Sequence, residues 1–274
     1  MNRTAAPNPV VIGKYYDHRV FDVMAEGDAN LHFGYWSGDD DPATFEQAMA
    51  EMTDQMIRRV DPGPGQRMLD VGCGNGAPAL QLAKARDVEV VGISVSERQV
   101  ARGNAGAEAA GLADRVRFEQ IDAMNLPYPD ASFDHAWALE SMLHMPDKGR
   151  VLAEMARVVR PGGRIVLADM TYQELPAEQR SAVPVSDTTV YAALATLAEY
   201  EEHIRGAGLV TTDVTDVTKE TARNHIEYVN WMTERRDQFV DILGVEGFEL
   251  FVGNQAALGR MPELGYVLIT AQRP

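Results

Sequence analysis

The sequence predicts an α/β fold built on a Rossmann-like sheet of seven strands, with helical elements that act as a lid. Two observations support this prediction. From residue 41 onward, helical periodicity alternates with short β-branched runs, which is typical of parallel strands joined by helices. The 274 residues are also 45% apolar and 24% charged, as in ordinary folded domains. One large domain, or one domain with a lid, is therefore expected.

The first part of the chain, residues 1–60, is predicted to form N-terminal helices and an aromatic lid loop. An Asp-Pro-Gly-Pro-Gly run at 61–65 ends the helical pattern, because proline and glycine disfavour further helix. The core is therefore expected to occupy residues 61–274. The N-terminal elements are expected at 10–24 (one amphipathic helix), 30–36 (the loop Asn-Leu-His-Phe-Gly-Tyr-Trp) and 42–60 (a second helix).

The core is expected to contain seven strands, the first five of which are joined mostly by helices. Two later stretches, at about 170–196 and 219–264, are longer than a sheet connection requires. We predict that these two insertions cover the functional site. The strands are expected at 67–71, 88–94, 116–121, 133–138, 163–169, 209–217 and 265–272.

The functional site is expected along one edge of this sheet, because open α/β sheets bind ligands beyond the carboxyl ends of their strands. The residues at or just beyond these ends are Gly72, Ser94, Asp122, Glu140 and Asp169. They form the rim on which candidate binding and catalytic residues are sought.

A glycine-rich loop follows the first strand and opens a helix, with the sequence Leu-Asp-Val-Gly-Cys-Gly-Asn-Gly at 69–76. Glycines at Gly72 and Gly74 allow the backbone to turn tightly and to approach a ligand. Their G-x-G-x-G spacing differs from the G-x-G-x-x-G of dinucleotide-binding folds. Asp70 stands just before the loop, where it can order the loop amides or meet a cationic ammonium group. The loop therefore favours a methionine-derived cofactor over a pyrophosphate.

The glycine loop and four later motifs resemble, in order and interval, those of class I S-adenosylmethionine-dependent methyltransferases. Together with the aromatic loop and the segment 138–142, the resemblance narrows to bacterial natural-product methyltransferases, especially the rebeccamycin sugar 4'-O-methyltransferase type. It implies S-adenosyl-L-methionine as cofactor and a small-molecule acceptor, with oxygen as the preferred atom and nitrogen or carbon left open. The four later motifs lie at 92–94, 122–124, 126–134 and 160–163.

The resemblance assigns four residues to the two ends of the cofactor. It places Gly72 and Gly74 beside the methionine half, and Asp122 where its carboxylate accepts from the adenine amino group. Ala123 would lie beside the adenine ring. A simple strand-to-helix turn is the alternative for the glycine loop taken by itself.

Ser94 departs from the pattern of many class I enzymes, which have Asp or Glu on the ribose hydroxyls at this place. A serine hydroxyl can still bond to ribose, and Gln99 resembles the ribose-binding glutamine of cyclopropane-synthase-like relatives. Tyr16 and His32 resemble lid positions that reach the cofactor carboxylate in those relatives. Helix packing is an equal alternative for Tyr16.

Methyl transfer to a hydroxyl needs alignment and a proton acceptor, and His144 is the leading candidate base. The second of two adjacent histidines in the rebeccamycin-type enzymes matches His144, whereas Leu143 replaces the first. Their aspartate at the end of the fifth strand matches Asp169, which would orient or stabilise the imidazole. A structural histidine and a strand-end cap are the alternatives. The loss of polarity at Leu143 leaves a phenol, amine or ring-carbon acceptor open.

Aromatic side chains are candidates for the wall of the acceptor site, although core packing is the alternative for each. A metal is not expected, because the grouped acidic ligands of metal-dependent catechol-type enzymes are not found and Asp147 more simply caps a helix at 148–158. The predicted substrate-binding residues are Phe33, Tyr35, Leu143, Tyr172, Tyr228 and Trp231.

Net charge and cysteine content disfavour other classes of partner and location. The formal net charge of -16 disfavours nucleic acid and anionic membranes as partners, and no apolar run approaches the roughly 20 residues of a membrane span. A lone Cys73 and an N-terminus without signal-peptide features predict a cytoplasmic protein. A methyltransferase-fold cyclase that keeps the cofactor structurally is the main alternative function. A dinucleotide-binding protein is disfavoured by the glycine spacing, and the oligomeric state is left open.

Overall fold

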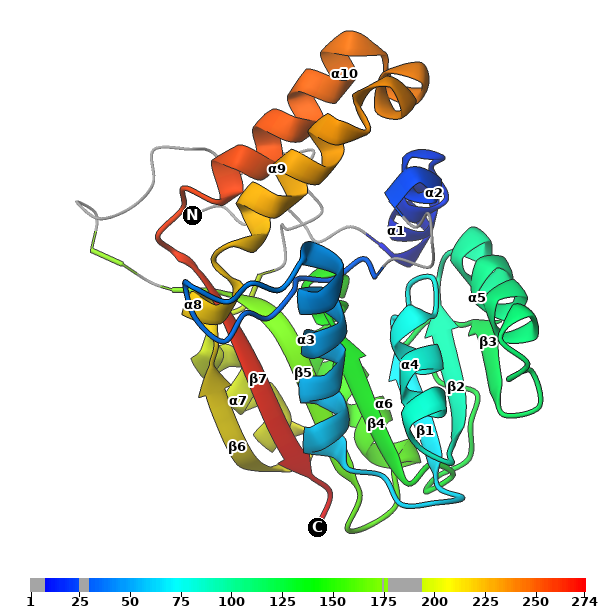
Figure 1. The fold of residues 1–274 in the computed structure, drawn as a ribbon. Helices are drawn as coiled ribbons and strands as arrows, with labels where there is room; N and C mark the ends of the chain where they lie inside the picture. Colours follow the sequence, from blue (N-terminus) through cyan, green and yellow to red (C-terminus); the bar gives the residue numbers. More distant parts are fainter. Residues whose placement is uncertain (1–7, 25–29, 174, 177–193) are drawn as a thin grey trace.

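The computed structural model describes residues 8–24, 30–173, 175–176 and 194–274, which form three layers of helix, sheet and helix (Figure 1). The predicted seven strands are confirmed, in the spatial order β3-β2-β1-β4-β5-β7-β6. Most of the predicted insertion at 170–196 lies outside the described residues. The strands are β1 Arg67–Val71, β2 Glu89–Ser94, β3 Val116–Gln120, β4 His135–Leu139, β5 Arg164–Tyr172, β6 Val210–Asp216 and β7 Leu264–Gln272.

The sheet is mixed, and its last strand departs from the parallel direction that the alternating sequence pattern indicates. β7 lies between β5 and β6 and runs antiparallel to both. Figure 1 shows the reason: helices α8, α9 and α10, which connect β6 to β7, all lie beyond the carboxyl edge of the sheet. The chain therefore enters β7 at the edge where β6 ended, and it has to run the opposite way. These helices span Thr218–Thr221, Asn224–Glu234 and Arg236–Leu258.

Two apolar clusters cover the two faces of the sheet. Helices α3, α4 and α5 pack on one face, where Met52, Met56 and Trp137 are fully buried. Helices α6 and α7 pack on the other face, where Leu152 and Tyr200 are fully buried. The packing of α3 on the sheet joins it to the core, although it precedes residue 61. These helices are α3 Phe45–Val60, α4 Ala77–Ala85, α5 Glu97–Ala109, α6 Lys148–Val158 and α7 Leu197–Gly206.

Helix α3 begins three residues later than predicted, because Thr44 caps it. The Thr44 hydroxyl accepts from the backbone of Gln47, whose side chain in turn accepts from the Thr44 backbone. This reciprocal capping box satisfies amides that the helix itself cannot, and it sets the first helical residue.

The predicted single helix at 10–24 is broken into α1 (Pro9–Tyr16) and α2 (Val20–Met24). The break follows from Asp17, whose carboxylate accepts from the Ser96 hydroxyl at 2.7 Å and from the Arg98 amide at 3.2 Å. Asp17 thereby ties the end of α1 to the start of α5. Amphipathic periodicity alone did not reveal this contact, because the partners are 79 residues apart.

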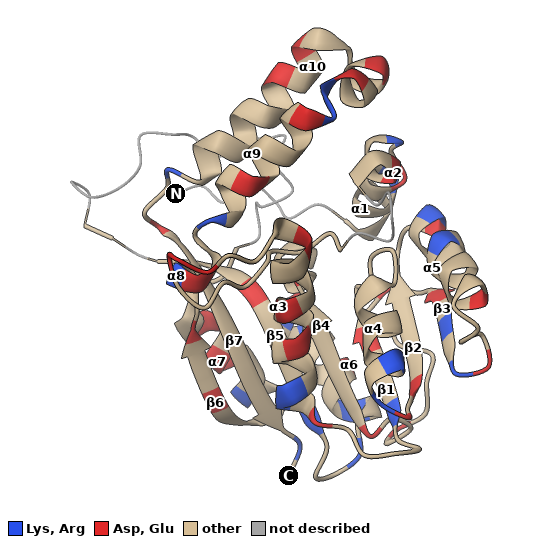
Figure 2. Cartoon of the chain, viewed as in Figure 1, with Lys and Arg blue, Asp and Glu red and all other residues tan. Residues whose placement is uncertain are grey.

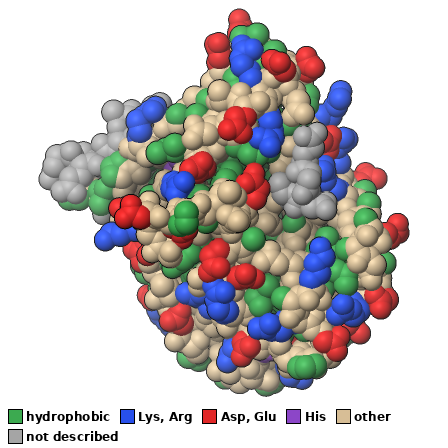
Figure 3. All heavy atoms as spheres, in the orientation of Figure 1, with side chains coloured by type: hydrophobic (Ala, Val, Ile, Leu, Met, Phe, Trp, Pro, Cys, Tyr) green, Lys and Arg blue, Asp and Glu red, His purple; other side chains and the backbone are tan. Residues whose placement is uncertain are grey.

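Charged side chains lie mostly on the helices and connecting loops (Figure 2). On the face shown in Figure 3, acidic and basic side chains are interspersed. Over the residues that the structure describes, no helix combines the length and apolar character that a membrane span requires.

Candidate active site

A cavity that is open to solvent lies at the carboxyl ends of β1, β2 and β4. Its wall comes from α1, the aromatic loop, the glycine loop and the segments that follow β2, β3 and β4. All eight residues predicted to bind the cofactor contribute to its wall, and so does the predicted base His144. The eight are Tyr16, His32, Gly72, Gly74, Ser94, Gln99, Asp122 and Ala123.

The glycine loop forms the floor of this cavity. Its positive φ values and its close contact with Ser141 require residues without a Cβ atom. Gly72 and Gly74 have φ values of 77° and 54°, in the left-handed region. A Cβ at Gly72 would lie 2.2 Å from the Cβ of Ser141. The Ser141 hydroxyl in turn donates to Val71 O at 2.6 Å, so the neighbour is held in place.

Asp70 lies beneath the glycine loop with an oxygen that lacks a partner. It is 2% exposed, and its Oδ2 has no hydrogen-bond partner in the described structure. Burial raises the pKa of Asp70 to about 7, against the lowering effect of the Trp137 indole. A buried, unpaired carboxyl oxygen beside a cavity fits a ligand that brings a cationic group. The α-ammonium of a methionine-derived cofactor is such a group.

Ser94 and Gln99 form the predicted pair on one wall of the cavity. The Ser94 hydroxyl donates to Gln99 Oε1 at 2.8 Å, and it accepts from the Ser96 amide at 3.1 Å. The Gln99 side-chain NH₂ is therefore turned away from Ser94 and can donate to a ligand hydroxyl.

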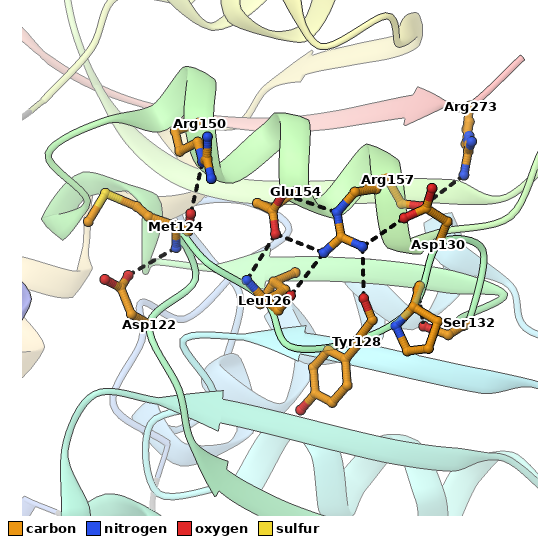
Figure 4. Close-up of polar contacts among 11 residues, drawn as sticks. Asp122, Met124, Leu126, Tyr128, Asp130, Ser132, Arg150, Glu154, Arg157 and Arg273 are labelled. Atoms are coloured by element: carbon orange, nitrogen blue, oxygen red, sulfur yellow. Dashed lines mark hydrogen bonds and ion pairs between the residues drawn. The ribbon is translucent and has the colours of Figure 1, made fainter.

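Asp122 and Ala123 lie on the loop after β3, next to the end of the neighbouring strand β2, where Ser94 pairs with Gln120. Asp122 Oδ1 accepts from the Met124 amide at 2.9 Å (Figure 4). The second carboxylate oxygen, Oδ2, makes no described hydrogen bond. This arrangement leaves one fixed acceptor atom for an amino group.

A second cavity, also open to solvent, adjoins the first one. Of the predicted acceptor-wall residues, Phe33 and Tyr228 line it. Helix α10 supplies much of the remaining wall, largely with apolar side chains such as Leu243 and Phe251. Four residues line both cavities and so mark the junction between them: Tyr16, Leu31, Glu140 and His144.

At the junction, Tyr16 and His144 form a pair that the sequence analysis did not predict. The Tyr16 hydroxyl and His144 Nε2 are 2.6 Å apart, and the rings meet edge to face at 5.3 Å. His144 ends the short 3-10 helix η2 (Met142–His144), and Tyr16 ends α1. Their roles were predicted separately, as base and as cofactor contact.

Asp169, the predicted partner of His144, lies deeper, among other groups. Its Oδ2 accepts from the Tyr200 hydroxyl at 2.7 Å, and its Oδ1 accepts from the Met170 amide at 2.9 Å. Burial raises the pKa of Asp169 to about 6, while Tyr200, Lys148 and backbone amides, including that of Leu143, lower it. Asp169 therefore contacts the backbone of η2 at Leu143, the residue before His144.

Glu140 is the functional candidate that the sequence analysis placed on the rim without a role. It follows β4 with a left-handed φ of 47°, which is unusual outside glycine. Its Oε1 accepts from the Phe33 amide at 2.5 Å and from the Tyr266 hydroxyl at 2.7 Å. Burial raises the pKa of Glu140 to about 8, with Asp169 adding to the rise and the two hydrogen bonds opposing it. The residue thus fastens the aromatic loop at the junction.

His32 lines the first cavity, but both of its ring nitrogens already have protein partners. Nδ1 is 2.8 Å from Phe33 O, and Nε2 is 3.1 Å from the Thr53 hydroxyl. Burial lowers the pKa of His32 to about 4, so the ring is neutral near pH 7. These contacts favour a role in holding the aromatic loop over a charged contact with a cofactor carboxylate.

Four of the six predicted acceptor-wall residues lie outside both cavities. Tyr35 packs against the apolar cluster that includes α3, and Leu143 is a buried residue of η2. Trp231 packs on Phe239 under the guanidinium of Arg235, and Tyr172 ends β5. For Tyr35, Leu143 and Trp231, the aromatic or apolar character reflects packing. Among the described residues, no cluster of three or more His, Cys, Asp or Glu is arranged to hold a metal.

The sheet order, the left-handed glycine loop and the cavity over it define a class I S-adenosylmethionine-dependent methyltransferase fold and site. A family model described as "Methyltransferase domain" matches residues 69–167. The chain is 43% identical over 270 residues to a 27-O-demethylrifamycin SV methyltransferase of Amycolatopsis mediterranei, covering 98% of each chain. It is 37% identical to the methyltransferase GfsG of Streptomyces halstedii, covering 96% of this chain and 94% of the relative.

Among solved structures, the [4+2]-cyclase SpnF matches with a TM-score of 0.86 and 32% identity, covering 98% of each chain. The chain therefore belongs to the family of S-adenosylmethionine-dependent methyltransferases, in the branch that includes methyltransferases of natural-product biosynthesis. Its cofactor is S-adenosyl-L-methionine. The narrower resemblance to the rebeccamycin sugar 4'-O-methyltransferase type stays a prediction.

Proposed function

We propose that the protein transfers a methyl group from S-adenosylmethionine to a hydroxyl group of a small-molecule natural product, in the cytoplasm. The observation that carries the proposal is the pair of adjoining cavities, one over the glycine loop and one largely apolar, which meet at Tyr16 and His144. A methyl donor in the first cavity and a hydroxyl in the second would approach each other at this junction. The net charge of -16 supports a small acceptor over nucleic acid.

The first cavity offers a partner for each part of the cofactor. Gly72 and Gly74 allow its methionine half to approach the backbone, and Asp70 Oδ2 can receive its ammonium group. The Gln99 amide can donate to ribose, with Ser94 holding it in place. Asp122 Oδ2 can accept from the adenine amino group, with Ala123 beside the ring.

The chemistry is an in-line displacement at an already activated methyl group, so the protein supplies alignment, exclusion of water and a proton acceptor. When the acceptor oxygen attacks the methyl carbon and the carbon–sulfur bond breaks, the hydroxyl proton passes to His144. The Tyr16 hydroxyl holds the imidazole at the junction. Asp169 supports the same residue through the backbone of η2.

The direct test is methylation of 27-O-demethylrifamycin SV, the acceptor named for the 43% identical relative, and of related hydroxylated natural products. With S-adenosylmethionine carrying a deuterated methyl group, mass spectrometry should show the label on an oxygen of the product. Activity should survive excess EDTA. Restoration of a lost activity by magnesium alone would contradict the metal-free mechanism.

Cyclisation without methyl transfer is a second candidate, favoured by the 32% identity and full-length match to the cyclase SpnF. The replacement of a catalytic-type histidine by Leu143 is compatible with it. The two functions differ in stoichiometry. A methyltransferase releases one S-adenosylhomocysteine for each product, whereas a cyclase forms product of unchanged mass and leaves the cofactor intact.

A further inference from the structure

The loop that carries Asp122 and Ala123 is held in place by one face of helix α6. The segment 122–132 runs outside the sheet, so its backbone polar groups need partners from elsewhere. Arg150, Glu154 and Arg157 of α6 supply them. Spacings of four and three residues put these three side chains on one side of the helix, facing the loop (Figure 4).

The three side chains bond mainly to loop backbone. Arg150 Nε donates to Met124 O at 2.9 Å, and Glu154 Oε2 accepts from the Leu126 amide at 2.9 Å. Arg157 donates to Leu126 O at 2.9 Å and to Tyr128 O at 2.7 Å. The loop backbone is therefore held by α6 from Met124 onward, two residues after Asp122.

Arg157 is the centre of this arrangement because its guanidinium has no spare donor. An arginine has five N–H donors, and Arg157 makes five described bonds. Two go to the loop carbonyls, two go to Glu154 at 2.8 and 3.1 Å, and one goes to Asp130 at 2.8 Å. The bond to Asp130 is exposed and contributes little. The carbonyl bonds and the pairing with Glu154 hold the loop.

We infer that Arg157 is a positioning residue of the cofactor site, which sets the place of Asp122 and Ala123 although it does not line the cavity. The chain of contacts is short. Arg157 and Glu154 fix Leu126, Arg150 fixes Met124, and the Met124 amide bonds to Asp122. A loosened loop would let the carboxylate move away from the adenine amino group, and cofactor affinity would fall.

The inference rests on the proposed adenine contact of Asp122, but it does not depend on the acceptor. It can be tested by calorimetric titration of S-adenosylhomocysteine into the folded full chain. Arg157→Gln should raise the Kd about tenfold. The matched control is Arg160→Gln, which removes a more exposed arginine that pairs with Asp134, beyond the end of the loop segment 122–132. Its Kd should stay at the wild-type value.

A double-mutant cycle separates positioning from a general loss of stability. If Arg157 acts through Asp122, then Arg157→Gln should cost little further affinity in an Asp122→Ala background. In a Tyr16→Phe background, its cost should be undiminished. Arg157→Lys, which keeps the charge but loses the planar fork, should lie between wild type and Arg157→Gln, and it serves if the glutamine variant does not fold.

Each outcome decides one claim. Wild-type affinity in Arg157→Gln and Arg157→Lys would overturn the inference, and so would full additivity with Asp122→Ala. Unchanged affinity in Asp122→Ala alone would instead remove Asp122 from the adenine site. In that case the proposed cofactor contact fails, and the positioning claim fails with it.

Discussion

The two adjoining cavities are built in different ways. The cofactor cavity is lined largely by loops at strand ends, and its floor is backbone held in left-handed turns at Gly72 and Gly74. The acceptor cavity is lined by side chains of helices α1, α2 and α10 and of the aromatic loop. The first is therefore specified by a short local motif, whereas the second is specified by how distant segments pack. One site can stay constant across a family while the other varies.

The junction between the two cavities is held by side-chain contacts between distant segments. Tyr16 and His144 are 128 residues apart in the sequence, and Glu140 connects the aromatic loop to β7 across 107 and 126 residues. Because these contacts are made by side chains on separate elements, they can be removed one at a time. The predictions below use them to separate cofactor binding from chemistry.

The largest effect is expected for His144→Ala. If the acceptor hydroxyl must lose its proton, the chemical rate should fall by roughly 10² to 10⁴, while the affinity for S-adenosylhomocysteine changes little. Single-turnover rates and calorimetry measure the two quantities. Losses in His144→Ala and Asp169→Asn should be strongly non-additive in the double variant. Retention of most of the single-turnover rate would falsify the general-base role and favour an amine or ring-carbon acceptor.

Gly72→Ala should have the next largest effect, on cofactor binding. A Cβ at φ 77° and 2.2 Å from Ser141 disfavours the native loop by roughly 1–3 kcal/mol. The free loop should relax to avoid this strain, and restoring it on binding should raise the Kd of S-adenosylhomocysteine by up to about a hundredfold. Gly111→Ala is the matched control, because its φ of 67° is equally left-handed but no atom lies within 4 Å of the added Cβ. Equal losses of affinity in both variants would contradict a local role for the glycine loop.

Tyr16→Phe should lower the methylation rate by about tenfold and shift its pH profile. The substitution removes the hydroxyl that contacts His144 Nε2 but keeps the ring packing on Phe21. Rate against pH, measured at saturating cofactor, checks this. Tyr15→Phe is a suitable control, because Tyr15 is the neighbouring tyrosine on α1 and shares the contact with Phe21. A rise in the Kd of the cofactor with an unchanged rate would assign Tyr16 to the cofactor carboxylate instead.

The smallest expected effect is on how the free energy of unfolding depends on pH. A carboxyl whose pKa is raised in the folded state binds its proton more tightly there, so the free energy of unfolding falls as pH rises from the unfolded to the folded pKa. For Glu140 this window runs from 4.5 to about 8, and for Asp70 it ends at about 7. His32 and His225, whose pKa is lowered to about 4, act in the opposite direction, but only below about 6.5.

Glu140 should therefore dominate the window above pH 7. Urea unfolding of the cofactor-free protein should show a loss of about 1 kcal/mol between pH 7 and 8. Glu140→Gln, which keeps an oxygen that can accept from Phe33 and Tyr266, should flatten this dependence. An equally steep dependence in the variant would assign the titration to another group.

The sequence predicted the strands of the core closely, because buried parallel strands and their helices leave strong local signals. Six of the eight predicted cofactor residues line one cavity for a related reason: the carboxyl ends of adjacent strands meet at one edge of a sheet. Tyr16 and His32 line it from α1 and the aromatic loop. Prediction failed where local pattern and distant contact disagree. The expected helix at 10–24 is broken by Asp17, and β7 runs antiparallel because its connection to β6 stays beyond the carboxyl edge of the sheet.

The acceptor wall shows the limit most clearly. Tyr35 and Trp231 are aromatic, as residues of a binding surface often are, but they pack against the rest of the protein. Helix α10, by contrast, lines the acceptor cavity with apolar residues that form no recognisable sequence motif. The glycine spacing and the positions of the strands along the chain could be predicted from the sequence alone, because backbone conformation depends on residues close in the chain. The pairing of Tyr16 with His144 and the fastening of the loop by Glu140 were decided by tertiary structure, because side chains more than 100 residues apart meet only once the helices and sheet have packed.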